Sequence, residues 1–568
     1  MQSKKTPKSY QARNLSTTIS NELSVDSQPS FNLHKNLQPS PLLEKQKSLP
    51  NFTDSSNLEY ELEQHENEIE MLNEFLYEGL KAYDQGQYHV ATNLYARYLK
   101  AMLTTYGEEY PDVGFAYNQF GSALEKTGRI DKAFEYYQRA LKIFRKFEDI
   151  SLPNIATCYG NIGSILSAKG YSKEALGYFQ ESLNIRTQAF GEDHESLASS
   201  YSNIGKVYFD LGEYEKALTN HLQSLRLRLK YFGEGHDYVA SCYSNIAMIY
   251  SIQGKHQEAL EYHKMALNIR ANNYSMEHPK IATCYQHIGM VFFNQKNYSK
   301  ALDYLQSSLQ VFLNVFKEEN THIATCYTNL GLVHQELGNY EVAFDFFNKS
   351  LNIYVNVFGE EHPDVAKSYN NIGLSLCHLG QYSEGMDCFK KALRIYYELY
   401  EEDHLETANF YNNIASVHEK EGKIDLALQH YEECKKIREK YLPKDHPEIG
   451  TVYLSIGLLY FKEKNYDQAL PNYETALEIR LKNYGENDPE VAKLHIQVAN
   501  TYREQKRYSK ALESFEKAKE IKVGIFGEKS TAVKQLYEEI SNIKAMQRTM
   551  MTMDDNKENV PIVASLKK

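Results

Sequence analysis

Four side chains that could take part in catalysis lie close together near the middle of the chain, namely Cys326, Tyr327, His334 and Glu336. A thiol, an imidazole and a carboxylate are groups that covalent and general acid–base catalysis use. However, the stretch 324–365 recurs every 42 residues, and small residues replace the cysteine in other copies. The shared position holds Cys158, Cys242, Cys284 and Cys326 in four copies and Ala116, Ser200 and Ser368 in three others. This interchange indicates a small packed position, so we expect reduced thiols rather than disulfides or metal ligands.

Tyrosines and histidines form rows with the same spacing. Nine successive copies hold a tyrosine at one position, from Tyr117 to Tyr453. These rings could stack a ligand, but we interpret them as packed aromatic residues. A row of six histidines consists of His194, His236, His278, His362, His404 and His446. Metal ligands converge within about 2 Å of one ion, whereas neighbouring helices lie about 8–10 Å apart. We therefore interpret the histidines as linker or helix-start residues and expect no metal site.

Enzyme signatures with a defined mechanism do not occur in the sequence. It holds no GxxxxGK phosphate loop, no GxSxG elbow, no HExxH and no CxxC. The paired acids Glu360 and Glu361 belong to a repeated linker, where we expect them to be solvated. The sequence therefore predicts no catalytic residues and no cofactor.

The 42-residue period defines the architecture. One position, which we call the anchor, is a glycine or alanine in each of copies 1 to 11: Gly79, Gly121, Gly163, Gly205, Ala247, Gly289, Gly331, Gly373, Ala415, Gly457 and Ala499. Each copy carries two helical patterns. In copy 8, helix A begins at Pro363 and carries an apolar stripe to Leu376, and helix B begins near Tyr382. Stacked helical pairs predict an all-α fold, a right-handed α-solenoid superhelix.

Glycine is expected to end each helix A in the left-handed conformation, as Gly380 does in copy 8. Three copies have Lys296, Lys464 and Lys506 at this place, and Asn297 and Asn465 follow two of them. Because asparagine tolerates the left-handed conformation, we expect these two asparagines to adopt it.

The chain divides into five segments. Residues 1–56 are rich in Ser, Asn, Gln and Pro and are predicted to be disordered. Residues 57–73 form a helical lead-in with about two heptads, fewer than the three or four that predict a coiled coil. Residues 74–529 hold the eleven repeats, 530–550 form a capping helix, and 551–568 form a disordered tail.

Composition excludes several classes of protein. A net charge of −12 argues against nonspecific nucleic-acid binding, which requires a basic surface. No apolar run approaches the roughly 20 residues of a membrane span, and no signal-peptide core follows Met1. We therefore expect a cytoplasmic protein.

Three motifs within the 42-residue unit carry a resemblance to a known family. They are FGEEHPDVA at Phe358–Ala366, YNNIG at Tyr369–Gly373 and SLNIR at Ser182–Arg186. The units resemble the kinesin light chain and nephrocystin-3 type of tetratricopeptide repeat. This resemblance implies a concave peptide-binding groove, partners such as kinesin heavy chain or ciliary proteins, and a cytoskeletal or ciliary location. The long heptad segment that docks kinesin light chains on the motor is missing here.

The groove residues that we predict lie on helix A. By resemblance, the position two before the anchor faces the groove, and an amide there can pair with the main chain of an extended peptide. Apolar side chains and two lysines lie at nearby positions and would give the groove anchors for an apolar peptide with one acidic residue. The predicted set is Asn161, Asn203, Asn245, Asn329, Asn371, Asn413, Lys206, Lys367, Met248, Met290, Leu332, Leu374, Phe209 and Phe293. Alternatively, the asparagines bridge helices locally, and superhelical curvature buries some of the apolar residues.

The sequence thus predicts a noncatalytic scaffold or adaptor that binds extended segments of other proteins. Kinesin-type cargo transport or ciliary assembly follows from the resemblance. The alternatives are a signalling or polarity scaffold and a regulatory subunit of an enzyme complex. In the tail, Lys557, Glu558 and Asn559 match a short KEN degradation signal.

Overall fold

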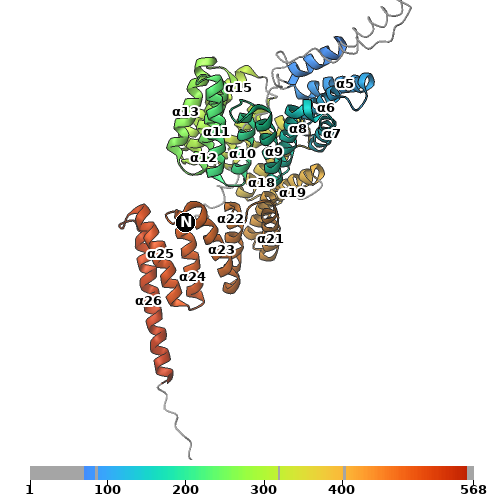
Figure 1. The fold of residues 1–568 in the computed structure, drawn as a ribbon. Helices are drawn as coiled ribbons and strands as arrows, with labels where there is room; N and C mark the ends of the chain where they lie inside the picture. The colour runs from blue at the N-terminus through green and yellow to red at the C-terminus, as the bar shows by residue number, and fades with distance from the viewer. Residues whose placement is uncertain (1–69, 84–86, 317–319, 401–403, 559–568) are drawn as a thin grey trace, which may run out of the picture. The chain divides into compact units, whose positions relative to one another are not determined.

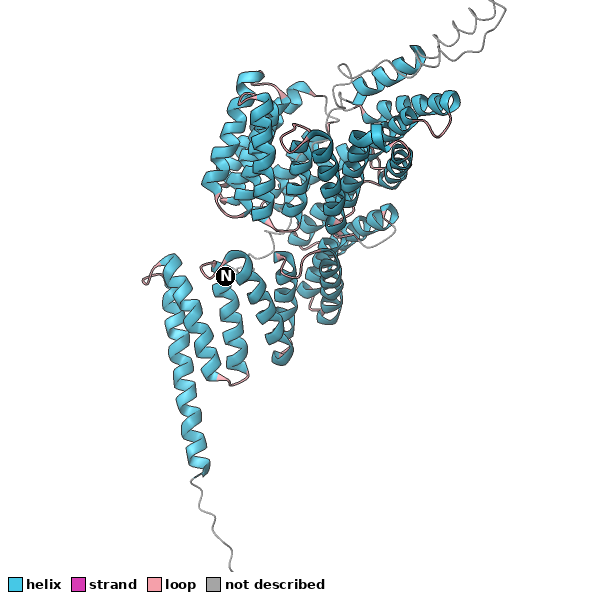
Figure 2. Cartoon of the chain, in the orientation of Figure 1, coloured by secondary structure: helices cyan, strands magenta, loops and turns pink. Residues whose placement is uncertain are grey.

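The computed structural model describes residues 70–83, 87–316, 320–400 and 404–558. These residues form helices and the turns between them, with no strand among them (Figure 2). This confirms the predicted all-α solenoid. The predicted disordered segment 1–56, residues 57–69 of the lead-in and residues 559–568 of the tail lie outside the described residues.

The helices follow one another as A and B partners of successive copies (Figure 1). In copy 1, residues 70–83 form helix A. The later A helices are α6 (Pro111–Lys126), α8 (Glu148–Ala168), α10 (Leu197–Asp210), α12 (Asp237–Ile252), α14 (Pro279–Asn294), α16 (Thr321–Glu336), α18 (Pro363–His378), α20 (Thr407–Lys420), α22 (Pro447–Lys462) and α24 (Pro489–Glu504). The B helices are α5 (Tyr88–Tyr106), α7 (Ile130–Arg145), α9 (Ser172–Phe190), α11 (Tyr214–Phe232), α13 (His256–Asn273), α15 (Tyr298–Val315), α17 (Tyr340–Phe358), α19 (Tyr382–Leu399), α21 (Ile424–Tyr441), α23 (Tyr466–Tyr484) and α25 (Tyr508–Phe526).

The row of six histidines lies at the starts of A helices, as predicted. Each imidazole Nδ1 accepts a hydrogen bond of 3.0 to 3.3 Å from the backbone N–H two residues later. In four copies the histidine is the N-cap residue, so the bond satisfies one of the N–H groups that a helix start leaves without a partner. His194 and His404 lie two residues before the N-cap. Several of these rings also stack on an aromatic ring four residues earlier, for example His362 on Phe358 with centroids 3.9 Å apart. The histidines therefore fix how the chain enters helix A.

The turn between helices A and B needs a residue in the left-handed conformation. Glycines provide it in most copies, for example Gly338 with φ 81° and Gly380 with φ 85°. In three copies lysines adopt it instead, each with φ 60°. The prediction for Asn297 and Asn465 was therefore wrong, because these residues have φ of −89° and −86° and instead cap the following B helix through their side chains.

The anchor position brings the two helices of a copy close together. A Cβ added to Gly331 would lie 2.6 Å from Cε1 of Phe347, which is 1% exposed on α17. The same relation holds between Gly121 and Tyr137 at 2.9 Å. The ring therefore fills the space that the missing side chain leaves, and this contact sets the spacing within the hairpin.

The chain forms two compact units, which we describe separately. The first comprises residues up to Leu379 together with Arg394–Tyr400, and the second comprises Gly380–Leu393 and the residues from Glu401 onward. In the second unit, α26 (Thr531–Glu558) follows the last repeat and packs on α25. Its buried residues Val533, Leu536, Ile540 and Ile543 cover the apolar face of that repeat. The helix continues to Glu558, past the predicted boundary at 550.

Candidate interaction surface

Successive A helices of the first unit contact one another and form a continuous surface, which we call the A-helix wall. In α8, Asn161 Nδ2 donates to Asn118 Oδ1 of α6 over 2.8 Å. In α14, Asn294 Nδ2 donates to Ser251 Oγ of α12 over 2.9 Å. In copies 7 and 8, Ser375 Oγ lies 3.3 Å from Gln335 Oε1. Polar side chains on this wall therefore link copy 2 to copy 3, copy 5 to copy 6 and copy 7 to copy 8.

Five of the predicted asparagines lie on this wall, Asn413 lies on α20 in the second unit, and the six differ in burial. Asn161 and Asn203 are half-buried, and Asn161 bridges two helices in the way that the local alternative predicts. The remaining four are buried, with 3% of Asn245, 0% of Asn329, 9% of Asn371 and 6% of Asn413 exposed. Neither amide atom of Asn329 has a hydrogen-bond partner among the described residues. An unsatisfied buried amide costs on the order of 1–3 kcal/mol, so this side chain holds a donor and an acceptor that no described residue uses.

The predicted apolar groove residues are mostly buried in the first unit. Met248, Met290, Leu332, Phe209 and Phe293 are 4% to 6% exposed, and Leu374 is half-buried. Met248 of α12 packs in one apolar cluster with Phe209 of α10, so neighbouring A helices cover each other's apolar side chains. In the second unit, by contrast, Leu458 at the same repeat position is 37% exposed. Ser416, at this position in the same unit, is 7% exposed, so burial of the row differs from copy to copy and is not set by the repeat position alone.

The predicted lysines Lys206 and Lys367 are half-buried on α10 and α18. Burial lowers the pKa of the Lys206 amine, Asp210 on the same helix opposes this, and Lys126 and Lys367 lower the pKa further. Lys126 belongs to α6. The charges of copies 2, 4 and 8 therefore influence one another within the first unit.

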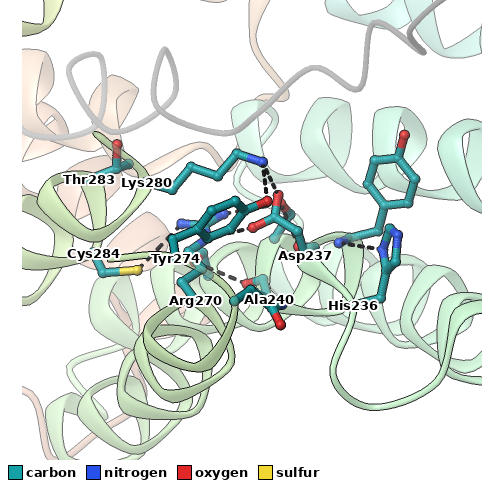
Figure 3. Close-up of polar contacts among 12 residues, drawn as sticks. His236, Asp237, Ala240, Arg270, Tyr274, Lys280, Thr283 and Cys284 are labelled. Atoms are coloured by element: carbon teal, nitrogen blue, oxygen red, sulfur yellow. Dashed lines mark hydrogen bonds and ion pairs between the residues drawn. The ribbon is translucent and has the colours of Figure 1, made fainter. Parts of the chain in front are cut away.

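A row of arginines links neighbouring copies, and the sequence analysis did not assign this role to them. Arg186, Arg228, Arg270, Arg438 and Arg480 lie 23 residues after their anchors. Figure 3 shows Arg270 of α13 reaching Asp237 of α12, with Nε and Oδ1 3.1 Å apart, and Cys284 of α14, with Nη1 and Sγ 3.4 Å apart. The recurring Arg in SLNIR and ALNIR was the sequence signal for this role.

The carboxylate of Asp237 joins two copies (Figure 3). It accepts a hydrogen bond of 2.9 Å from Lys280 Nζ in addition to that from Arg270. Burial would raise the pKa of the Asp237 carboxyl, but the two cations outweigh burial and hold this pKa below its usual range. The network therefore fixes α14 against copy 5 and does not resemble a catalytic site.

Other kinds of site were sought in the part of the chain that the structure describes. No group of three or more His, Cys, Asp or Glu side chains there could hold a metal ion. The seven cysteines are free, and six of them are buried. None of the described helices is long and apolar enough to cross a membrane.

Within the described residues, these observations define a helical repeat protein in which the A helices of the first unit form a continuous wall. The tetratricopeptide-repeat model matches residues 80–146, 154–230, 196–272, 244–314, 280–356, 322–375, 364–440 and 448–522. Because these matches cover most of the chain, it belongs to the tetratricopeptide-repeat family. Chains of this family act as protein-interaction scaffolds, and their stacked repeats provide extended binding surfaces.

Solved structures with similar repeats include BtubC (BKLC) from P. vanneervenii, with 21% identity and a TM-score of 0.33 over 41% of this chain and 94% of that chain. A candidate kinesin light chain from Podosopora anserina with nearly identical repeats has 18% identity and a TM-score of 0.30 over 37% of this chain and 100% of that chain. A Rap protein complexed with competence and sporulation factor has 16% identity and a TM-score of 0.43 over 67% and 99%. These identities and TM-scores do not indicate which ligands the present chain binds. No curated protein matches the chain in sequence.

Proposed function

We propose that this scaffold binds extended segments of partner proteins along its A-helix wall. The observation that carries the proposal is the buried amide of Asn329, which has no hydrogen-bond partner among the described residues. Extended peptides expose main-chain N–H and C=O groups at regular intervals, and an amide can donate to one and accept from the other. A row of wall asparagines therefore fits a partner's main chain whatever its side chains.

Side-chain selectivity would come from residues that differ between copies. Lys206 and Lys367 favour a segment with an acidic residue, and Met248, Met290, Leu332, Leu374, Phe209 and Phe293 favour apolar anchors. The exposed Leu458 offers a comparable apolar contact in the second unit. The ligand is then a short extended segment with apolar side chains and an acid.

The test compares partner capture by two full-length variants. One replaces Asn203, Asn245, Asn329 and Asn371 of the wall by alanine. The matched control replaces Asn184, Asn268 and Asn352, which are exposed on B helices at a shared repeat position. We expect quantitative pull-downs to show at least a roughly tenfold loss for the wall variant, equivalent to about 1.4 kcal/mol, and no loss for the control. Equal capture by both would contradict the proposal.

The class of partner follows only from the resemblance of the repeats. It favours kinesin-type cargo transport or ciliary and cytoskeletal assembly, with kinesin heavy chain or ciliary proteins as partners. Finding a motor heavy chain among proteins captured by the wild type and lost by the wall variant would support the transport role. Loss of every interaction on deletion of residues 1–56 would instead make the array a spacer and favour a signalling scaffold or regulatory subunit.

A further inference from the structure

Segments far apart in the sequence meet within the first unit. Nε2 of His89, at the start of α5, lies 3.2 Å from the carbonyl oxygen of Val357 near the end of α17, 268 residues later. In a second contact, a Cβ added to Gly128, in the turn after α6, would lie 2.8 Å from Cδ2 of His362 before α18. These four residues, which we call the seam, join copies 1 and 2 to the linker between copies 7 and 8.

The contact at Gly128 is specific to that copy. Gly254 and Gly338 occupy the same place in the repeat and have φ of 74° and 81°, close to the 77° of Gly128. A Cβ added to either of them would have nothing within 4 Å. The seam is therefore not a general feature of the turn, and the first unit closes on itself at one place.

Charges inside the first unit agree with this closure. Lys206 of copy 4 is influenced by Lys126 of copy 2 and by Lys367 of copy 8, although these residues lie far apart in the sequence. Between these copies Leu332 is 6% exposed and Asn329 is fully buried, whereas Lys206 and Lys367 are half-buried. An extended segment has no access to Asn329 in this conformation.

We propose that the seam is a latch, and that the A-helix wall of the first unit admits its ligand only when the seam opens. This inference rests on the proposed function. The seam consists of one hydrogen bond, from His89 to Val357, and one close contact between Gly128 and a carbon of His362. Separating it is therefore easier than separating neighbouring copies, which share buried apolar surface. A ligand that binds only the open conformation shifts the first unit toward that conformation. When most molecules are closed, the apparent affinity for the ligand is lower.

Substitution of Gly128 tests the latch. Gly128→Asn keeps a residue that tolerates positive φ and places a side chain against His362, whereas Gly254→Asn makes the same backbone change with no neighbour to displace. His89→Ala removes the bond to Val357 from an exposed position and serves as a second, milder variant. The readout is the acetylation rate of Lys206 by an amine-reactive ester, measured by mass spectrometry relative to Lys216, whose side chain is 60% exposed.

We expect Gly128→Asn to raise the relative Lys206 rate by roughly fivefold or more, His89→Ala to raise it less, and Gly254→Asn to leave it unchanged. Capture of partners by Gly128→Asn should rise in parallel. Unchanged Lys206 rates in both seam variants would overturn the latch, even if the wall asparagines prove necessary for capture. A raised rate with unchanged capture would also overturn the latch as a control on binding. Failure of the proposed function has a different signature, namely equal capture by the wall variant and its control.

Discussion

At the scale of single residues, His221 shows how the repeat tolerates a costly side chain. It occupies the core position that holds Phe347 and Tyr137 in other copies, it is 0% exposed, and neither ring nitrogen has a hydrogen-bond partner among the described residues. Burial lowers the pKa of His221 to about 4. An unfolded histidine has a pKa of about 6.5, so below that pH the unfolded chain binds a proton that the folded chain excludes.

We therefore predict that His221→Phe reduces the acid sensitivity of the fold. Stability that His221 provides in its neutral form is lost as pH falls from about 6.5 toward 4, and at pH 5 the loss is about 2 kcal/mol. Urea unfolding of wild type and variant at pH 7 and pH 5, followed by helical circular dichroism, measures this difference. The reciprocal Phe347→His should create the same sensitivity. If His221→Phe lost as much stability between pH 7 and pH 5 as the wild type, the role assigned to His221 would be refuted.

The anchor glycine makes a second residue-scale prediction. Gly331→Ala adds a Cβ 2.6 Å from the packed ring of Phe347, and overpacking of this kind costs about 1–3 kcal/mol, more than the roughly 1 kcal/mol that alanine gains in helix propensity. We expect net destabilisation by thermal unfolding. Gly177→Ala on α9, where the added Cβ has nothing within 4 Å, is the control and should be stabilising.

At the scale of elements, the turns with lysine in place of glycine are strained. The left-handed conformation costs a residue with a side chain about 1–2 kcal/mol. Glycine avoids this cost, but its loss of backbone freedom on folding costs about 0.5–1 kcal/mol more than that of alanine. Replacing Lys296, Lys464 and Lys506 by glycine should thus stabilise the chain by up to about 1 kcal/mol for each site. Gly338→Lys is the matched reverse change and should destabilise. A lower melting temperature for the triple variant would contradict this account.

Helix order, the glycine turns and the place of the histidines at linkers or helix starts could be predicted because each depends on local spacing that recurs in many copies. The left-handed lysines could not, since local propensity favours the adjacent asparagine, while the geometry of the turn assigns the conformation to the residue before it. The sequence left the burial of Met248 and Leu332 open between a groove position and burial by superhelical curvature. A residue that packs on the next A helix and one that faces a groove share the same repeat phase, so spacing does not separate them.

At the scale of the molecule, features that depend on distant contacts lie beyond any periodic pattern. The bond between His89 and Val357 joins residues 268 apart, and no repeat position marks either residue for it. Likewise, Leu332 is buried and Leu458 is exposed although both occupy the same repeat position, so the surroundings of each copy decide the burial. An array of similar copies thus acquires different surfaces through its tertiary arrangement, and partner choice would depend on these differences.

The central claim is that partners bind along the A-helix wall, and hydrogen exchange of a captured complex tests it most directly. The wild-type chain is compared with and without its tightest captured partner, and backbone protection is mapped onto each helix. We predict added protection on α10, α12, α14 and α16, with the wall variant losing both the protection and the partner. Protection confined to B helices, or to the ends of the chain, would contradict the claim.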